Sequence, residues 1–397
     1  MKNSFGNHLT VTLFGESHGP EIGAVLDGLP AGLFVDEDFI RHQLALRRPA
    51  GKISTARVEK DPFRIVSGVF NNHTTGTPLC ILIPNGNTHS SDYAKDLPRP
   101  GHADFAAECK YHGYQDYRGG GHFSGRITAA LVAAGAIAIS ILRRQQIEIG
   151  THISELAGIC DRPFEKDVFR DIAKLGETNF PVLSDEAAAR MRAAAEAAAE
   201  QGDSVGGVLE TLVTGFPAGV GEPWFDTVEG MLAHAIFSIP AIKGVEFGAG
   251  FGFARMKGSE ANDAFYMKDG RVCTRTNNNA GINGGITNGM PILFRSAVKP
   301  TPSIFLTQDT VNLKKMENAK LSLKGRHDPA IIHRARVVVD SVTALVLCDL
   351  LAGRWGTDYL LETKAPEYEL DEDFYEPPIT DGTYEYELDE NFDPKTN

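Results

Sequence analysis

The longest apolar stretch of this 397-residue chain runs from Ala129 to Leu142. A membrane-spanning helix needs about 20 apolar residues, so this stretch is too short to cross a bilayer. It predicts a helix over Thr128–Arg143 in a soluble protein instead. Met1–Thr12 lacks the basic start and the apolar stretch of a secretion signal, so no signal peptide is expected.

Composition and charge narrow the class of protein. With 42% hydrophobic and 23% charged residues, the chain can bury a substantial core in one large domain or in two or three smaller ones. The net charge of −13 argues against a general nucleic-acid binder, because phosphate backbones select for basic surfaces. Five scattered cysteines form no CxxC pair, which predicts reduced thiols in a cytosolic protein and no structural zinc site.

Most of the negative charge lies at the C-terminus. Residues 366–397 contain twelve acidic side chains and one lysine, which leaves residues 1–365 with a net charge near −2. The sequence therefore predicts a folded domain over 1–365 and a solvated, weakly ordered tail over 366–397. The near-repeat of YELDEDF at 368–374 and YELDENF at 386–392 leaves an alternative, in which the tail docks on a partner or a neighbouring subunit.

The predicted helices and strands follow one another irregularly. Acidic first turns indicate helices at Asp36–Arg48 and Ser184–Gln201, and Ser184 can cap the second. Further helices are expected at Phe105–Tyr111, Val228–Phe237 and Ile331–Leu351, and strands at Gly6–Phe14, Glu21–Leu26, Phe63–Val69, Leu79–Pro84, Val205–Phe216, Val245–Phe253 and Pro291–Ala297. Without regular βαβ alternation, α+β layering is expected rather than a doubly wound sheet.

The segment Gly15–Gly19 (GESHG) matches the GxSxG nucleophile elbow of serine hydrolases. That elbow requires a helix directly after the serine, whereas Pro20 and a strand-like segment follow here. The match therefore carries little weight for Ser17. The loop also displays His18, which either acts as a general acid or merely satisfies its own turn.

Glycine-rich and polar loops predict anion binding. Arg118–Arg126 (RGGGHFSGR) leads directly into the apolar helix, so backbone N–H groups and the helix dipole meet there between two arginines. The alternative is a tight turn whose glycines serve backbone geometry alone. Loops at Asn277–Gly289 and Lys299–Ser303 offer N–H groups to a ring system and a phosphate, although irregular turns explain each alone.

Two further loops, Arg99–Asp104 (RPGHAD) and Lys324–Pro329 (KGRHDP), each place a cation close to a titratable group. Asp328 beside Arg326 should ionise easily, as suits a base or an orienting group. Taken separately, each loop also fits a solvated turn. No spacing such as HExxH predicts a metal site.

Together these segments resemble the chorismate synthase family from Asn3 to about Gly353. The shared motifs, in chain order, are GESHG (15–19), LDGLPAG (26–32), RRP (47–49), RPGHAD (99–104), DYRGGG (116–121), KGVEFG (243–248), AGINGGI (280–286), KPTPS (299–303) and GRHDP (325–329). Nine motifs in one order are far more specific than any single one. The resemblance implies a layered β-α-β sandwich that assembles as a homotetramer.

The resemblance also implies a reaction. A carbon-oxygen lyase of aromatic amino-acid biosynthesis would convert 5-enolpyruvylshikimate 3-phosphate to chorismate by 1,4-anti elimination of phosphate. Reduced FMN (FMNH2) would lend electron density to the substrate without net consumption. Either NADPH reduces the flavin on this protein or an external flavin reductase supplies it. A metal, a membrane and a nucleic acid are not among the implied partners.

Residue roles are implied by the same resemblance. His18 would protonate the departing phosphate, His102 would be the partner of the reduced flavin, and Asp328 would assist proton removal. The implied substrate residues are Ser17, Arg47, Arg48, Arg99, Arg126 and Arg326. The implied flavin residues are His122, Phe123, Ser124, Ala241, Gly284, Lys299, Pro300, Thr301, Pro302, Ser303 and Arg326.

The chain departs from the commoner family residues at several positions. His122 stands where many members carry arginine, and SGRIT at 124–128 stands where many carry SARET. Ile53 replaces a second arginine that would contact a nicotinamide, and His333 and Asp340 depart in the last motif. Two hypotheses compete with the lyase: a serine hydrolase acting through Ser17, and a non-catalytic flavin-binding or scaffold protein whose tail recruits partners.

Overall fold

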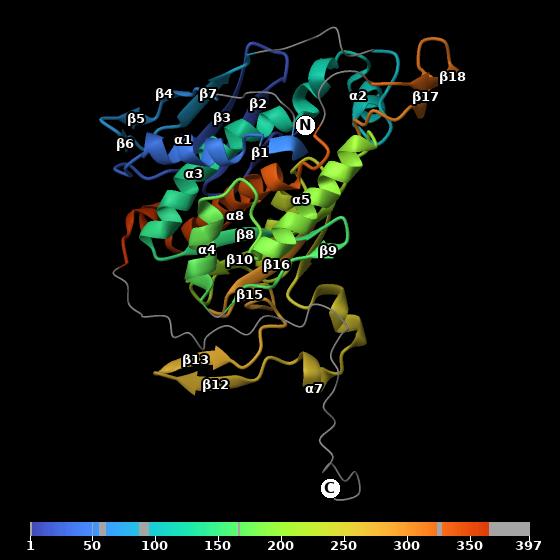
Figure 1. Cartoon of the computed structure of the whole chain (residues 1–397). Coiled ribbons are helices and arrows are strands. Elements are labelled where there is room, and N and C mark those ends of the chain that lie inside the picture. The colour runs from blue at the N-terminus through green and yellow to red at the C-terminus, as the bar shows by residue number, and fades with distance from the viewer. Residues whose placement is uncertain are drawn as a thin grey trace, which may run out of the picture.

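The computed structural model describes residues 2–49, 51–54, 61–86, 95–165, 167–323 and 328–364. Two five-stranded antiparallel sheets lie on either side of a layer of long helices (Figure 1). This arrangement confirms the expected α+β class and the β-α-β sandwich. The predicted tail over 366–397 lies outside the described residues, so its weak order and its docking role stay predictions.

The first sheet comes from the N-terminal part of the chain. Its strands, in spatial order, are β1 (Ser4–Phe5), β2 (Thr10–Gly15), β3 (Glu21–Asp27), β7 (Leu79–Pro84) and β4 (Arg64–Ser67). Alternate residues of β3 and β7 pair across the ladder, with Ile22 opposite Ile83 and Leu26 opposite Leu79. All four side chains are buried, so one face of this sheet rests on the helices.

The second sheet is covered on both faces. Its strands, in spatial order, are β11 (Ile242–Phe247), β16 (Ile292–Val298), β10 (Gly207–Thr214), β8 (Glu148–Leu156) and β9 (Ile159–Cys160). On the outer face, Leu212 and Leu293 pack with Phe164 and Ile172 in a small separate core. This cover explains why β10 is an almost continuous run of buried residues rather than an alternating one.

Two parallel helices fill the middle layer. They are α3 (Thr128–Arg144) and α8 (Ile332–Trp355). A Cβ atom added at Gly135 would lie 2.2 Å from the Cβ of Ser341, so the two backbones approach closely there. The segment Gly125–Arg144 is long and apolar enough to span a membrane, but 83% of it is buried inside the protein, as in the core helix of a globular domain.

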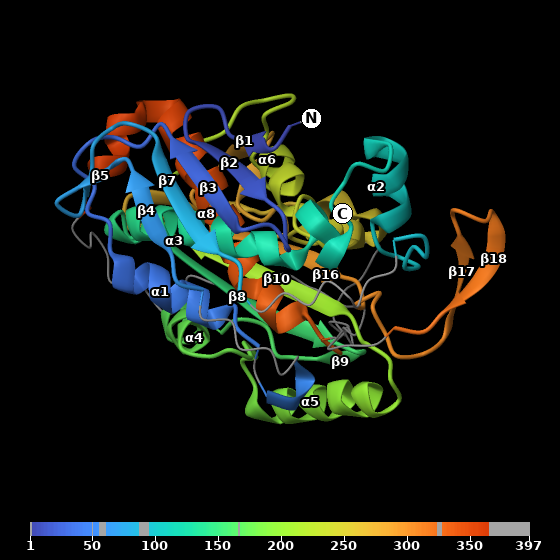
Figure 2. The ribbon, with the colours of Figure 1, turned by 90° about the horizontal axis from the view of Figure 1, so that it is seen from above.

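The remaining helices lie outside this middle layer (Figures 1 and 2). They are α1 (Glu37–Leu46), α2 (Asp104–Tyr111), α4 (Val168–Gly176), α5 (Asp185–Glu200), α6 (Val228–Ile236) and α7 (Gly258–Ala261). Asp36 caps α1 and Ser184 caps α5 with their side chains, and the sequence predicts the second of these caps. Four two-stranded hairpins complete the fold: β5 (Val69–Phe70) with β6 (His73–Thr74), β12 (Phe265–Lys268) with β13 (Arg271–Thr274), β14 (Ile282–Asn283) with β15 (Ile286–Thr287), and β17 (Gln308–Asn312) with β18 (Glu317–Leu321).

Three predicted strands are wrong in part, and each fails at a glycine. The strands predicted over 6–14, 63–69 and 245–253 are interrupted at Gly6, Gly68 and Gly248, whose φ angles are +104°, +83° and +54°. A positive φ angle is incompatible with extended strand geometry, so the chain turns at each position. After Gly248 a 3-10 helix, η5 (Gly250–Arg255), takes the place of the expected strand.

The first sheet is joined to α8 by one carboxylate. Asp349 is buried, and its side chain accepts hydrogen bonds from the backbone N–H groups of Asn7, His8 and Leu9 at 2.6 to 3.0 Å. Replacing Asp349 with Ala would leave three N–H groups without this acceptor. We expect the free energy of unfolding, measured with urea, to fall by about 3 kcal/mol or more.

The matched control is Asp185→Ala. The Asp185 side chain is 96% exposed and forms an ion pair with Lys174 on the surface. Its removal should lower the free energy of unfolding by less than about 1 kcal/mol, because water solvates both partners of the ion pair. Equal losses for the two variants would contradict the role assigned to Asp349.

Candidate active site

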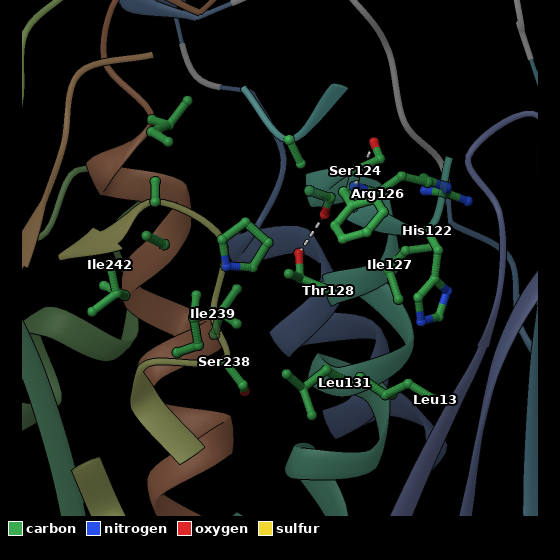
Figure 3. A pocket seen from close by; sticks show the side chains of 18 of the residues that line it. Leu13, His122, Ser124, Arg126, Ile127, Thr128, Leu131, Ser238, Ile239 and Ile242 are labelled. Atoms are coloured by element: carbon green, nitrogen blue, oxygen red, sulfur yellow. Dashed lines mark hydrogen bonds between the residues drawn. The ribbon is translucent and has the colours of Figure 1, made fainter. Parts of the chain in front are cut away.

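A cavity of about 930 Å³ opens between the N-terminal ends of α3 and α8. In Figure 3 the first turns of α3, which carry Thr128 and Leu131, face the connection that carries Ser238, Ile239 and Ile242 across the cavity. Much of the wall is apolar, formed by Leu13, Leu131, Ile239, Ile242, Val338 and Val342. The cavity can therefore hold a flat apolar group next to polar ones.

Cationic side chains gather on the remaining wall. They are Lys2, Arg47, Arg99, Arg126, Lys243, Lys299 and Arg334. Among the described lining residues, Asp328 is the one carboxylate. The first turns of α3 and α8 add the positive ends of their dipoles. A site of this charge suits a ligand with several anionic groups, although the whole protein is acidic.

His102 belongs to a tight ionic cluster at the start of α2. Its Nδ1 atom lies 2.6 Å from Oδ1 of Asp104, and Arg99 binds the same carboxylate through Nε and Nη2 at 2.8 Å. Burial opposes the charge on Asp104, but the hydrogen bonds from Arg99 and His102 outweigh it and lower the pKa of Asp104 far below its ordinary value. The carboxylate thus fixes the orientation of the His102 ring through Nδ1. Nε2 is the ring nitrogen that this carboxylate does not engage.

His18 lies in the turn between β2 and β3, and it lines the cavity. Its neighbour Ser17 is 3% exposed, and the backbone N–H of Ser17 donates to the carbonyl of Gly121 at 3.1 Å. The strand β3 follows this turn, not a helix, so GESHG is not a nucleophile elbow. The serine hydrolase hypothesis therefore loses its structural basis.

Arg47 and Arg126 share one buried carboxylate. Nη1 of Arg126 donates to Oδ1 of Asp61, and Nη1 of Arg47 lies 3.5 Å from its Oδ2. Arg47 also donates to the hydroxyl of Thr128 and to the carbonyl of Gly125, both at 3.0 Å. The three charged side chains are at most 6% exposed, so the two guanidinium groups are held in place before any ligand arrives.

Asp328 lies in the loop before α8 and faces Arg334 in the first turn of that helix. Nη1 of Arg334 donates to Oδ2 of Asp328 at 2.9 Å, and its Nε donates to the carbonyl of Arg47 at 3.0 Å. Arg334 therefore connects Asp328 to the RRP turn. The sequence analysis missed Arg334, although it lies six residues beyond a predicted site carboxylate and could have been found by that spacing alone.

Most residues predicted for the flavin surround the same cavity. His122, Phe123, Ser124, Ala241, Lys299, Thr301, Pro302 and Ser303 line it. Nδ1 of His122 donates to the carbonyl of Gly15 at 2.7 Å, and Nζ of Lys299 donates to the carbonyl of Gly101. Burial and the nearby charge of Lys243 lower the pKa of Lys299.

Other predicted residues lie elsewhere. Ser17, Arg48 and Pro300 are adjacent to lining residues but do not line the cavity themselves, and Gly284 lies in the turn of the β14–β15 hairpin. Arg326 falls outside the described residues. Their assignments stay predictions. Lys243 and Asp61, which the sequence analysis missed, belong to the cavity and its ionic support because of contacts that no local motif encodes.

The departures from commoner family residues have structural partners. Ile53 is 1% exposed and belongs to the hydrophobic core, so the place of an arginine is taken by an apolar contact. Nε2 of His333 lies 2.7 Å from the hydroxyl of Ser54 and joins that segment to α8. Asp340 pairs with Arg336 at 3.2 Å; burial raises the pKa of Asp340, and the charge of Arg336 opposes that shift.

Among the described residues, no group of three or more His, Cys, Asp or Glu side chains could hold a metal ion.

Comparison with known proteins identifies close relatives. The family model described as chorismate synthase matches residues 9–352. Relatives named chorismate synthase are 50% identical in Dehalococcoides mccartyi over 88% of this chain and 96% of theirs, and 46% identical in Thermococcus gammatolerans over 88% and 97%. A crystal structure of chorismate synthase matches with a TM-score of 0.71 and 30% identity, covering 89% of this chain and 94% of that one.

The buried imidazole of His333 predicts a pH-dependent loss of stability. Burial, with the charge of Arg334, lowers the pKa of His333 to about 3 from an ordinary value of about 6.5. The unfolded chain binds a proton at this residue near pH 6.5, whereas the folded protein binds it only near pH 3. The contribution of this residue to the free energy of unfolding is therefore fully present above pH 6.5 and falls as the pH drops toward 3. Between pH 7 and pH 5 we expect this residue to lower the free energy of unfolding by about 2 kcal/mol.

The measurement is urea unfolding of the wild type and of His333→Asn at both pH values. The wild type should lose about 2 kcal/mol more than the variant on acidification. His73→Asn, which removes a solvent-exposed imidazole, is the matched control and should follow the wild type. Parallel losses in wild type and His333→Asn would show that His333 does not carry the pH dependence.

Proposed function

The chain belongs to the chorismate synthase family and is therefore a lyase, and from that premise we propose that it converts 5-enolpyruvylshikimate 3-phosphate to chorismate. The proposed reaction is a 1,4-anti elimination of phosphate that requires reduced FMN without net consumption. The observation that carries the proposal is one cavity in which seven lysine and arginine side chains, four histidines and one carboxylate line a partly apolar wall. A phosphorylated dicarboxylate needs such a cationic surface.

His18 is the proposed acid for the leaving phosphate. It lines the cavity beside the glycine-rich segment, where an anion would meet backbone N–H groups. Transfer of a proton from His18 to the departing phosphate oxygen makes the leaving group less basic and lowers the barrier to cleavage of the carbon-oxygen bond. Arg47 and Arg126, held by Asp61, are the proposed anchors of the anionic substrate.

Asp328 is the proposed carboxylate that assists removal of the ring proton. Its ion pair with Arg334 supports this role, because the guanidinium holds the carboxylate in one place beside the cavity. Arg334 is a positioning residue in this scheme, since it holds Asp328 against the turn that carries Arg47. Arg48, Ser17 and Arg326 are proposed substrate residues on the family resemblance alone.

The lining residues fit a flavin by their chemistry. The apolar wall suits a flat ring system, and Lys299, Thr301 and Ser303 offer donors to its phosphate. His102, held by Asp104, would face the reduced ring, with His122, Phe123, Ser124, Ala241, Gly284, Pro300, Pro302 and Arg326 as the other proposed contacts. When bound, reduced FMN supplies transient electron density to the substrate.

The wider setting follows from the family rather than from the cavity. We propose a cytoplasmic homotetramer, with NADPH or an external flavin reductase as the source of electrons. The buried Ile53 removes one expected nicotinamide contact, which favours the external reductase. Residues 366–397 are proposed to be dispensable for turnover, so deleting them should leave the lyase active, whereas a scaffold that depends on its tail would lose its partner.

The direct test is anaerobic turnover of 5-enolpyruvylshikimate 3-phosphate with chemically reduced FMN. Phosphate and chorismate are followed in the same sample, and the proposal requires equal release of both. Omission of the reductant should abolish both products. A folded, flavin-binding protein that forms neither product would refute the proposed reaction and favour the scaffold.

Two substitutions test the proposed proton transfers. His18→Ala and Asp328→Ala should each lower kcat by about 10²-fold or more, because general acid and base contributions are of that size. The dissociation constant for FMN, measured by fluorescence titration, should change little. His73→Ala and Asp309→Ala, both at exposed positions, are the controls and should keep wild-type turnover. Wild-type kcat in His18→Ala or Asp328→Ala would remove that residue from the mechanism.

A further inference from the structure

We propose that Gly119 and Gly120 are positioning residues, each of which seats one of the two histidines of the cavity. Gly119 supports the ring of His18, and Gly120 supports the ring of His102. The inference rests on the proposed function for what the two rings do, but not for how they are held. Its physical content is that the backbone of one short segment serves as the floor for both imidazoles.

The backbone of this segment has an unusual conformation that hydrogen bonds hold in place. In η3 (Arg118–Phe123) the φ angles of Gly119, Gly120 and Gly121 are +59°, +85° and +55°. Arg118 holds the start of the segment through two hydrogen bonds of 2.8 Å to the carboxylate of Asp116. The carbonyl of Gly121 accepts from the N–H of Ser17 at 3.1 Å, which ties the segment to the turn that carries His18.

Gly119 lies directly against His18. A Cβ atom at Gly119 would be 2.2 Å from Cε1 and 2.4 Å from Nδ1 of the His18 ring, and 2.9 Å from the rotatable hydroxyl of Ser17. Carbon atoms in van der Waals contact are about 3.5 Å or more apart, so the ring occupies the space that any side chain would need. An alanine here requires the imidazole to move by about 1 Å or more.

Gly120 stands in the same relation to His102, with less overlap. A Cβ atom at Gly120 would be 3.1 Å from Cε1 and 3.3 Å from Nε2 of His102, and 3.6 Å from Nη2 of Arg99. The ring would have to yield by only a few tenths of an ångström. Arg99 and Asp104 hold this ring from the other side, so His102 has little freedom to yield.

Adjacent Cα atoms are about 3.8 Å apart, so the two rings rest on neighbouring residues of one backbone. His18 comes from the β2–β3 turn and His102 from the loop before α2, and this segment contacts both. The mutual placement of the proposed phosphate acid and the proposed flavin partner is thus set by one peptide unit. A conformational need for positive φ alone would not explain why each missing Cβ points at an imidazole.

The experiment compares three glycine-to-alanine variants. Gly119→Ala should lower kcat by about 10²-fold, because a displacement near 1 Å of a reacting group has an effect of that order. Gly120→Ala should lower kcat by less than about tenfold, because its ring moves less. Gly158→Ala is the matched control: its φ angle is +78° and no atom lies within 4 Å of the added Cβ, so it shares the backbone strain without touching a histidine. It should keep wild-type kcat.

Crossing the glycine variants with the histidine variants identifies the partner of each glycine. In a His18→Ala background, Gly119→Ala should lower kcat further by less than about twofold, because the displaced ring is already gone. In a His102→Ala background it should keep its full effect. Gly120→Ala should lower kcat further by less than about twofold in the His102→Ala background and should keep its full effect in the His18→Ala background. Wild-type kcat in Gly119→Ala, or equal effects in both backgrounds, would overturn the inference.

The same pairs can be tested without turnover, which separates this inference from the proposed reaction. The midpoint of urea unfolding should fall more when Gly119→Ala is introduced into the wild type than when it is introduced into His18→Ala. This comparison holds whether or not chorismate is formed, and it also covers a Gly119→Ala protein that folds poorly. Equal shifts of the midpoint in the two backgrounds would overturn the packing of His18 on Gly119.

Discussion

The contact between α3 and α8 is the arrangement on which the rest of the molecule depends. Gly135 and Ser341 allow the two backbones to approach closely, and the apolar faces on either side of this pair support the two sheets. A larger residue at Gly135 would separate the helices and disturb both sheet contacts at once. The same pairing brings the N-terminal ends of both helices to one place, which is where the cavity opens.

The positive charge of the cavity follows from this placement of the two helix N-termini. Two helix dipoles and seven cationic side chains converge on a cavity in a protein whose overall charge is −13. The acidic residues that approach it, Asp61, Asp104 and Asp328, each bind one or two arginines. They order the cations instead of neutralising the site as a whole. The site is therefore preorganised for anions before a ligand binds.

Much of this could be predicted from the sequence, and the reasons for the failures are physical. Helix caps at Asp36 and Ser184 are local signals, so the bounds of α1 and α5 were predictable. The strand breaks at Gly6 and Gly248 depend on backbone angles that hydrophobic patterning does not encode. Contacts such as Arg334 with the carbonyl of Arg47, or Asp61 with Arg126, join segments that only the folded chain brings together. Most of the residues that the family resemblance named line the cavity, but the resemblance gave no reason for their positions.

The position of α8 in the chain has a consequence for the order of assembly. This helix fills the centre of the sandwich, yet among the elements of residues 2–364 that the structure describes it is the last long one to leave the ribosome. Asp349 also closes the N-terminal segment at Asn7 to Leu9, so the first strands wait for a partner that is synthesised near the end. The first sheet and α3 are synthesised early, but the surfaces that α8 covers stay open until translation is nearly complete. During that interval the nascent chain exposes its most aggregation-prone surfaces, and a chaperone that shields them would raise the yield of folded protein.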